Sequence, residues 1–141
     1  MVYVTRAFLP RRRWIKALSV TAVVGLEAAA AWAQLPSPSE LRQQFQETDR
    51  NGDGRIDREE FHRRSAELFY FLDKDRKSYL MIGDIKGLAV EDFKAVDRQG
   101  DGKLTLEEFI NARFRNFDAA DTNSDGVLTI AEIEVYVNRQ R

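Results

Sequence analysis

Residues 49–60 have the sequence DRNGDGRIDREE, in which acidic and amide side chains alternate with glycine before an isoleucine. The pattern returns every 24 residues, and comparable segments begin at Asp49, Asp73, Asp97 and Asp121. The later segments are DKDRKSYLMIGD at 73–84, DRQGDGKLTLEE at 97–108 and DTNSDGVLTIAE at 121–132. We name the four segments loops 1 to 4 in chain order. A fixed period of this kind indicates that one structural unit is repeated along the chain.

Apolar residues keep the same period around each loop. A phenylalanine lies four residues before each loop, an aliphatic residue takes the eighth loop position, and an apolar residue follows the loop. These residues are Phe45, Phe69, Phe93 and Phe117; Ile56, Leu80, Leu104 and Leu128; and Phe61, Ile85, Phe109 and Ile133. We expect the phenylalanines before the loops and the residues at position 8 to pack in the core.

The loops resemble the calcium-binding loop of the EF-hand family, whose pattern is D-x-[DN]-x-[DN]-G-x5-E. Loops 1 and 4 fit this pattern throughout, and loop 3 departs from it only at Gln99. The resemblance covers residues 40–141. It implies an all-α fold of EF-hand helix–loop–helix repeats that bind Ca²⁺, a hard cation that takes six to eight oxygen ligands.

The resemblance assigns six ligand positions to each of loops 1, 3 and 4. Positions 1, 3 and 5 supply side-chain oxygens, position 7 supplies its backbone carbonyl, position 9 acts directly or through water, and position 12 supplies both carboxylate oxygens. Glycine at position 6 permits the positive φ of the sharp turn. The predicted metal ligands are Asp49, Asn51, Asp53, Arg55, Asp57 and Glu60; Asp97, Gln99, Asp101, Lys103, Thr105 and Glu108; and Asp121, Asn123, Asp125, Val127, Thr129 and Glu132.

Loop 2 departs from the pattern at three places. Lys77 puts a cation where an oxygen ligand belongs, Ser78 replaces the turn glycine, and Asp84 is one methylene shorter than glutamate. A positive charge held near a bound cation repels it. We therefore predict that loop 2 is a degenerate copy that keeps the fold and binds Ca²⁺ weakly or not at all. A site for the smaller Mg²⁺ that uses Asp84 is the alternative.

The connectors between loops are short. Only twelve residues separate consecutive loops, so each connector must form one shared helix or bend sharply. Phe61, Leu68, Phe69 and Leu72 fall near one face of such a helix, and Gly87 is a candidate for a bend in the next connector. If the connectors stay straight, consecutive loops lie at opposite ends of a rod about 20 Å long. On that basis we expect loop 1 to pair with loop 3, and loop 2 with loop 4.

Composition excludes several kinds of function. Residues 34–141 hold 17 of the 22 bases and 22 of the 23 acids, so this region carries a net charge of −5. Nucleic acid is not an expected partner, because binding it needs a clustered basic surface. The chain has no cysteine, which excludes disulfides, thiolate metal sites and cysteine nucleophiles.

The N-terminus has the three parts of a secretory signal. A basic segment at 11–16 precedes an apolar run at 17–26, and Ala31-Trp32-Ala33 fits a cleavage site before Gln34. Residues 10–16 also resemble the twin-arginine export pattern, although a proline stands where serine or threonine is preferred. We leave the export route open between the general and the twin-arginine pathway.

A permanent membrane anchor is the alternative interpretation of this segment. Residues 17–33 number only 17 and contain Glu27, whereas a spanning helix needs about 20 apolar residues and a carboxylate in hydrocarbon is costly. We therefore expect cleavage, a periplasmic or secreted protein of bacterial type, and no membrane span after cleavage.

These observations divide the chain into three parts. Residues 1–33 form the signal peptide, residues 34–44 form a linker with the start of a helix, and residues 45–141 form the EF-hand domain. Pro36 and Pro38 are expected in an extended segment at the boundary.

Binding of calcium ions is the predicted function, as a buffer or as a calcium-stabilised domain. The alternative is a sensor that captures an unidentified protein partner on calcium loading, but residues 34–141 contain one methionine, Met81, whereas adaptable sensor grooves use many. No nucleophile–base pair, phosphate-binding loop or catalytic metal motif is present, so we do not expect an enzyme.

Overall fold

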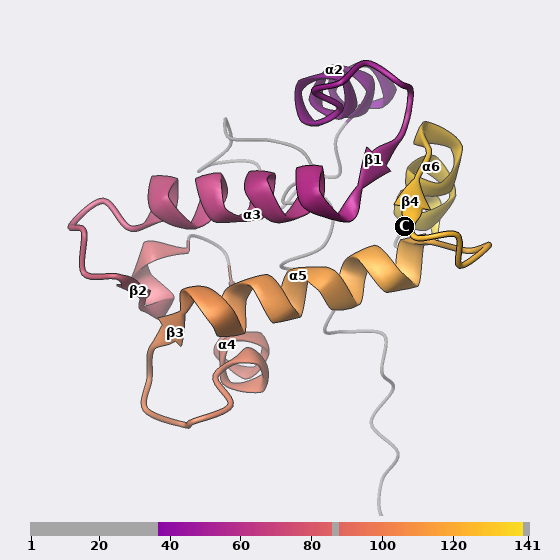
Figure 1. Ribbon diagram of the computed structural model, residues 1–141. Helices are drawn as coiled ribbons and strands as arrows, with labels where there is room; N and C mark the ends of the chain where they lie inside the picture. The colour runs from indigo at the N-terminus through magenta and orange to yellow at the C-terminus, as the bar shows by residue number, and fades with distance from the viewer. Residues whose placement is uncertain (1–36, 86–87, 140–141) are drawn as a thin grey trace, which may run out of the picture.

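The structure is a computed structural model and describes residues 37–85 and 88–139. In chain order this part of the protein contains α2 (Pro38–Thr48), β1 (Ile56–Asp57), α3 (Arg58–Leu72), β2 (Tyr79–Leu80), the 3₁₀ turn η1 (Ile82–Asp84), α4 (Val90–Val96), β3 (Leu104–Thr105), α5 (Leu106–Ala120), β4 (Val127–Leu128) and α6 (Ile130–Asn138) (Figure 1). The expected signal peptide and Gly87 lie outside the described residues. Among the described residues, no helix is long and apolar enough to cross a membrane.

The first described helix begins with a capping box. The Ser37 amide donates to the Glu40 carboxylate at 2.7 Å, and the Glu40 amide donates to Ser37 Oγ at 3.3 Å. Pro38 takes the first helical position, where its missing amide costs no hydrogen bond. The expectation of an extended segment through Pro38 is therefore wrong. The φ of proline suits both conformations, and the cap favours the helix.

The first and third connectors each form one continuous helix. α3 and α5 have 15 residues each, so the helix that leaves one loop is the helix that enters the next. At 1.5 Å per residue each is about 22 Å long. Figure 1 shows the two helices side by side, with paired loops at either end. This part of the sequence prediction is confirmed.

The second connector turns back instead of continuing as a helix. η1 ends loop 2, the Leu88 amide donates to the Ile85 carbonyl at 3.4 Å, and α4 begins only at Val90. The chain thereby reverses its direction between loop 2 and loop 3. As a result, α5 runs back along α3.

The loops pair as first with last and second with third. β1 lies antiparallel to β4, with Ile56 opposite Leu128, and β2 lies antiparallel to β3, with Leu80 opposite Leu104. The prediction that loop 1 pairs with loop 3 and loop 2 with loop 4 is therefore wrong. It assumed straight connectors throughout, whereas the turn in the second connector brings loops 2 and 3 to one end. α3 and α5 then carry loops 1 and 4 to the other end.

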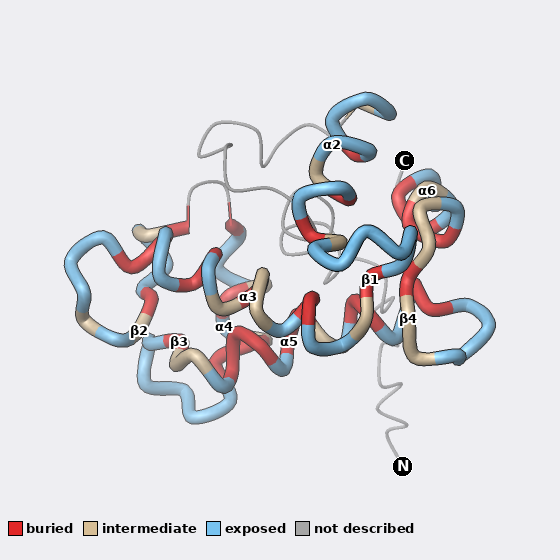
Figure 2. The backbone as a smooth tube through the Cα atoms, turned by 45° about the horizontal axis from the view of Figure 1, so that its top comes forward, coloured by how far each residue is buried: buried red, intermediate tan, exposed pale blue. Residues whose placement is uncertain are grey.

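Each pair of loops has its own hydrophobic core. Around loops 1 and 4 the core residues are Leu41, Phe45, Ile56, Phe61, Phe117, Ala120, Leu128, Ile133, Tyr136 and Val137. Around loops 2 and 3 they are Leu68, Phe69, Leu72, Leu80, Ile85, Leu88, Phe93, Val96, Leu104, Phe109 and Ala112. The phenylalanines before the loops and the residues at position 8 are all buried, as predicted. Figure 2 shows buried residues recurring along both α3 and α5.

A buried arginine lies between the two cores. Arg113, on α5, is 1% exposed and its Nε donates to Ser65 Oγ at 2.8 Å. Its guanidinium carbon lies 5.2 Å from the centroid of the Phe61 ring and 5.9 Å from that of Phe109, one ring from each core. Burial, with a smaller contribution from the charge of Arg64, lowers the pKa of Arg113 to about 9. A buried polar contact therefore lies between the two apolar cores.

Candidate metal centres

The first residue of loop 1 organises the backbone that follows it. Asp49 Oδ1 accepts hydrogen bonds from the amides of Gly52 at 2.8 Å and Asp53 at 3.1 Å, and Oδ2 accepts from Gly54 at 2.8 Å. An aspartate side chain readily bonds the amides just after it, which favours a turn. These bonds wind the loop around the carboxylate of Asp49.

Two further side-chain oxygens lie within the same turn. Asn51 Oδ1 accepts from the Asp53 amide at 2.8 Å, and Asp53 Oδ1 accepts from the Arg55 amide at 2.8 Å. Carbonyl and carboxylate oxygens keep a second lone pair while they accept one hydrogen bond. Loop 1 thus collects three oxygen-bearing side chains in one short stretch, as its sequence predicts.

Loops 3 and 4 are wound in the same way. Asp97 Oδ2 accepts from the Gly102 amide at 2.8 Å, and Asp121 Oδ2 accepts from the Gly126 amide at 2.9 Å. The oxygen Oδ1 of each aspartate accepts from amides earlier in its loop. Position 1 therefore has one structural role in all three predicted sites.

Loops 3 and 4 share the contact at position 5 and differ at position 3. Asp101 and Asp125 at position 5 each accept from the amide two residues on, at 2.9 and 3.0 Å. Asn123 Oδ1 at position 3 of loop 4 accepts from the Asp125 amide at 3.0 Å. Among the described contacts, Gln99 has no equivalent bond, and its longer side chain is the single departure of loop 3 from the pattern.

Glycine at position 6 has the conformation that the turn requires. Gly54, Gly102 and Gly126 have φ of +79°, +77° and +83°. A Cβ added at any of the three would meet no atom within 4 Å. The requirement therefore concerns the left-handed backbone, which glycine adopts without steric cost, and not the space around it.

The glutamate at position 12 joins the two ends of its loop. Glu60 Oε1 accepts from the Arg50 amide at 2.9 Å, and Oε2 accepts from the Asp57 amide at 3.2 Å. Glu108 and Glu132 make the same two kinds of contact. All three glutamates are buried, which is unusual for this residue type and indicates a specific role.

Hydrogen bonds favour the ionised form of two of these glutamates. Burial raises the pKa of Glu108 and of Glu132, but hydrogen bonds from Thr105 and Thr129 and from amides near the loop starts outweigh it. The pKa of both carboxyls therefore lies below the ordinary value for glutamate. Carboxylates must be ionised to ligate a divalent cation, so this environment suits metal binding.

Position 9 has a structural role in addition to the predicted one. Asp57, Thr105 and Thr129 are the N-caps of α3, α5 and α6, and each accepts from the amide of the glutamate at position 12. The loop pattern predicts these residues only as direct or water-mediated ligands. The spacing of a capping box, [ST]-x-x-E with aspartate as an equivalent cap, would have revealed this second role.

The donor chemistry of the loops fits a hard cation. Within residues 37–85 and 88–139, no three histidine, cysteine, aspartate or glutamate side chains are grouped closely enough to hold a metal ion. The carboxylates at positions 1 and 12 instead bond backbone amides. Carboxylate and amide oxygens on a prepared backbone nevertheless suit Ca²⁺ in donor type. The backbone carbonyls of Arg55, Lys103 and Val127 stay predicted ligands.

Two family models match the chain. A model described as an EF-hand domain pair matches residues 38–113, which is more than half of the 141 residues. A model described as an EF hand matches residues 114–135. No curated protein matches the chain. The first match contains loops 1, 2 and 3, and the second contains loop 4.

Proposed function

The chain belongs to the EF-hand family, and we propose that its loops 1, 3 and 4 hold calcium ions and, from its first 33 residues, that it is exported. EF-hand domains bind Ca²⁺. We propose that the bound ions are a permanent part of the fold or a bound store. The protein would then act as a calcium-stabilised domain or a calcium buffer.

One observation carries the proposal, namely the shared oxygen set of the three loops. In loop 1, Asp49, Asn51 and Asp53 lie within one wound turn, and the buried Glu60 closes it. Several carboxylates held in one loop repel one another, so a cation bound there offsets the repulsion and stabilises the native loop. Loops 3 and 4 present comparable sets.

Export is proposed from the first 33 residues, which lie outside the described residues. Calcium is often plentiful outside the cytosol, where sites with dissociation constants of about 10⁻⁴–10⁻³ M are sufficient. Such sites would be filled most of the time. This supports a stabilising role for the ion and gives no reason to expect a switch.

A calcium sensor is the second candidate function, because some large apolar side chains are exposed. Phe71, Met81 and Val90 are 42%, 47% and 49% exposed. A partner helix could bind to such side chains, but a single methionine offers little of the adaptability that sensor surfaces use. We therefore place the buffer first. EF-hand domains are typically non-catalytic, and we propose no enzymatic activity.

Calorimetric titration of the full chain with Ca²⁺, with Mg²⁺ as competitor, tests the proposal. We expect three sites, one each in loops 1, 3 and 4. Affinities near millimolar support a constitutively loaded domain, and micromolar affinities favour the sensor. Absence of binding to a correctly folded chain would overturn the proposal.

Two cheaper measurements separate the candidate functions. Because Ca²⁺ binds the native loops in preference to the unfolded chain, chelation with EDTA should lower the melting temperature of the full chain. Unchanged melting would contradict calcium binding. Calcium-dependent binding of a hydrophobic dye would favour the sensor, and dye binding that does not respond to calcium would favour the buffer.

A further inference from the structure

Loop 2 is wound like the other loops although its sequence is degenerate. Asp73 Oδ1 accepts from the Lys77 amide at 2.9 Å, and Oδ2 accepts from the Ser78 amide at 2.7 Å. Arg76 and Ser78 have φ of +55° and +66°, the left-handed region that glycine occupies in loop 1. A non-glycine residue in this region is strained. Some interaction must therefore hold loop 2 in this conformation.

The far end of loop 2 is closed differently from that of the other loops. In loops 1, 3 and 4 the glutamate at position 12 accepts from the amide at position 2, at 2.9, 3.0 and 3.2 Å. In loop 2 the shorter Asp84 keeps the contact with the amide at position 9, that of Met81, at 2.8 Å, as the glutamates do in their own loops. The amide of Lys74 at position 2 instead donates to the Leu72 carbonyl. Among the described contacts, the bond that joins the two ends of the other loops is thus replaced.

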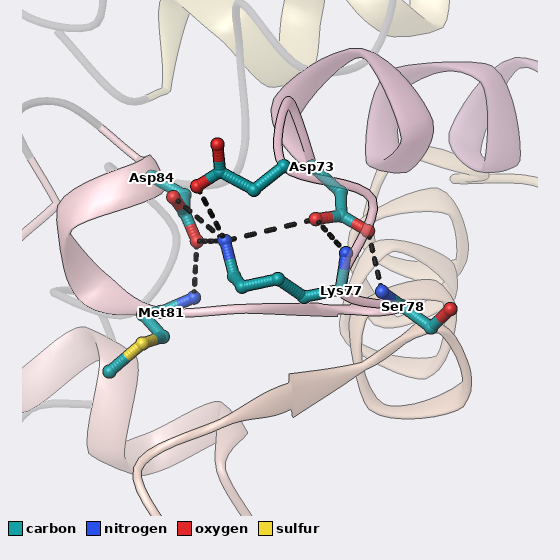
Figure 3. Close-up of polar contacts among 6 residues, drawn as sticks. Asp73, Lys77, Ser78, Met81 and Asp84 are labelled. Atoms are coloured by element: carbon teal, nitrogen blue, oxygen red, sulfur yellow. Dashed lines mark hydrogen bonds and ion pairs between the residues drawn. The ribbon is translucent and has the colours of Figure 1, made fainter.

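The Lys77 side chain joins the two ends instead. Its ammonium nitrogen lies 3.2 Å from Asp84 Oδ2, 3.4 Å from Asp75 Oδ2 and 3.8 Å from Asp73 Oδ1 (Figure 3). These carboxylates hold positions 1, 3 and 12 of the loop, which are ligand positions in the calcium-binding pattern. The ammonium therefore lies among the side chains that would otherwise be the ligands of an ion.

The surroundings of Lys77 favour its charged form. The side chains of Lys77 and Asp84 are 21% and 20% exposed, and that of Asp73 is 2% exposed. Desolvation lowers the pKa of Lys77, but the hydrogen bonds and charges of Asp84 and Asp75 outweigh it and raise the pKa. The Asp75 side chain is 78% exposed, so Asp73 and Asp84 are the partly buried partners of the ammonium and Asp75 adds a solvent-exposed one. Together they form a network, which holds a loop better than an isolated surface ion pair does.

We propose that loop 2 carries its own cation: the Lys77 ammonium takes the place of a divalent ion among Asp73, Asp75 and Asp84 and keeps the loop closed without metal. The missing methylene of Asp84 and the lysine at position 5 are complementary changes. In the described part of the chain the Asp84 carboxylate does not bond the amide at position 2, and it contacts the Lys77 ammonium instead. Loop 2 accordingly takes neither Ca²⁺ nor Mg²⁺.

A closed loop 2 also prepares loop 3. Leu80 pairs with Leu104 and Tyr79 with Thr105 across the β2–β3 ladder. The Tyr79 ring lies 5.7 Å from the ammonium of Lys77 and 4.8 Å from that of Lys103, one lysine from each loop. The end of the molecule with loops 2 and 3 is therefore ordered before calcium binds, whereas the end with loops 1 and 4 depends on it. This consequence for loop 3 rests on the proposed function, but the closure of loop 2 does not.

Amide hydrogen exchange of the full chain in EDTA tests the proposal without any substitution. We expect the amides of β2 and β3 to exchange about tenfold more slowly than those of β1 and β4, because only the β2–β3 ladder adjoins a loop that is held by a tethered cation. Equal exchange at the two ladders, or slower exchange at β1 and β4, would overturn the proposal.

A matched pair of variants assigns the effect to the ammonium. Lys77→Met keeps an unbranched side chain one atom shorter and removes its charge, and Lys74→Met does the same at an exposed position of the same loop. In EDTA we expect Lys77→Met to remove the extra protection of β2 and β3, and Lys74→Met to retain it. Protection that survives Lys77→Met overturns the proposal. If Lys77→Met does not fold, the comparison of ladders in the unchanged chain decides.

Titration of the unchanged chain separates this inference from the proposed function. Binding of three Ca²⁺ ions, in loops 1, 3 and 4, with neither Ca²⁺ nor Mg²⁺ in loop 2, supports both the proposed function and the tethered cation. A fourth divalent ion, located in loop 2 by shifts of the Lys77 and Ser78 amide resonances, overturns the tethered cation and leaves calcium binding intact. A chain that binds no calcium but keeps the β2–β3 protection overturns the proposed function and retains the closed loop 2.

Discussion

Ser65 and Arg113 hold equivalent places in α3 and α5, 48 residues apart, and they are hydrogen-bonded to each other at 2.8 Å. Each is the eighth residue of a 15-residue helix. The two long helices are therefore in contact at their midpoints through related residues. This relationship places a polar layer between the two cores. It also leaves the terminal nitrogens Nη1 and Nη2 of Arg113 buried without a hydrogen-bond partner among the described residues.

We predict that Arg113→Met raises the free energy of unfolding of the calcium-loaded protein by about 1 kcal/mol. Replacing a buried charge by an apolar side chain of similar length is often stabilising, and each buried polar group without a partner is costly. Ser65 keeps a partner, since its Oγ donates to the Phe61 carbonyl at 2.7 Å. Urea denaturation measures the change, and Arg115→Met, at an exposed position of α5, serves as control. A loss of stability would show that stacking of Arg113 on the aromatic rings outweighs its desolvation.

The β1–β4 ladder predicts coupling between loops 1 and 4. We expect Glu132→Gln to weaken calcium binding in loop 4 directly and in loop 1 by about fivefold or more, while loop 3 changes little. Coupling between the two bound ions is reciprocal, so Glu60→Gln should weaken loop 4 by the same factor where each substitution abolishes binding in its own loop. A calcium titration that follows the amide resonances of Gly54 and Gly102 separates loop 1 from loop 3. Equal weakening of both would contradict the observed pairing.

The positive φ of Gly54 in loop 1 predicts that adding one methyl group there lowers the stability of the protein. Gly54→Ala should lower the free energy of unfolding by about 1–2 kcal/mol, because φ is +79° there and a Cβ disfavours that conformation. Gly83→Ala is the matched control, since Gly83 has no positive φ and a Cβ there also meets no atom within 4 Å. We expect the control to change stability by less than about 0.5 kcal/mol in urea denaturation. Equal effects at the two glycines would rule out the backbone explanation.

The lowered pKa values of Glu108 and Glu132 predict acid sensitivity of the metal-free protein. Their folded pKa lies below the ordinary value of 4.5, so their contribution to stability is complete above that pH. It is lost as the pH falls through the folded pKa of each group. Melting temperatures of the metal-free chain between about pH 7 and pH 3 measure this loss. The double variant Glu108→Gln and Glu132→Gln should lose less stability on acidification, and an unchanged slope would contradict the assignment.

Much of each loop follows from local rules that the sequence displays directly. Asp49 at position 1 bonds amides only three to five residues away, and Gly54 meets a requirement of its own φ. The periodic burial of Phe45 and Leu80 follows from their fixed distance to each loop. Interactions within a few residues hardly depend on the rest of the fold, which is why the sequence was sufficient to predict them. The capping boxes also depend only on residues three apart, so the sequence is sufficient to predict them as well.

The helix start at Pro38 shows where local information was ambiguous. Proline is compatible with an extended chain and with the first turn of a helix. The cap formed by Ser37 and Glu40 decides in favour of the helix. The contact of Lys77 with three carboxylates is a further example, since the sequence indicated a repulsive charge but not that its ammonium lies among those carboxylates.

The sequence by itself determined the positions of the loops, the predicted oxygen ligands and the periodic core residues, because each of these depends on near neighbours in the chain. Only the tertiary structure decided that loop 1 pairs with loop 4 and loop 2 with loop 3. The contact between Ser65 and Arg113 was likewise decided only by the tertiary structure. Both depend on the direction in which the chain leaves the second connector. The chain reverses its course between loop 2 and loop 3, and no repeat spacing encodes that reversal.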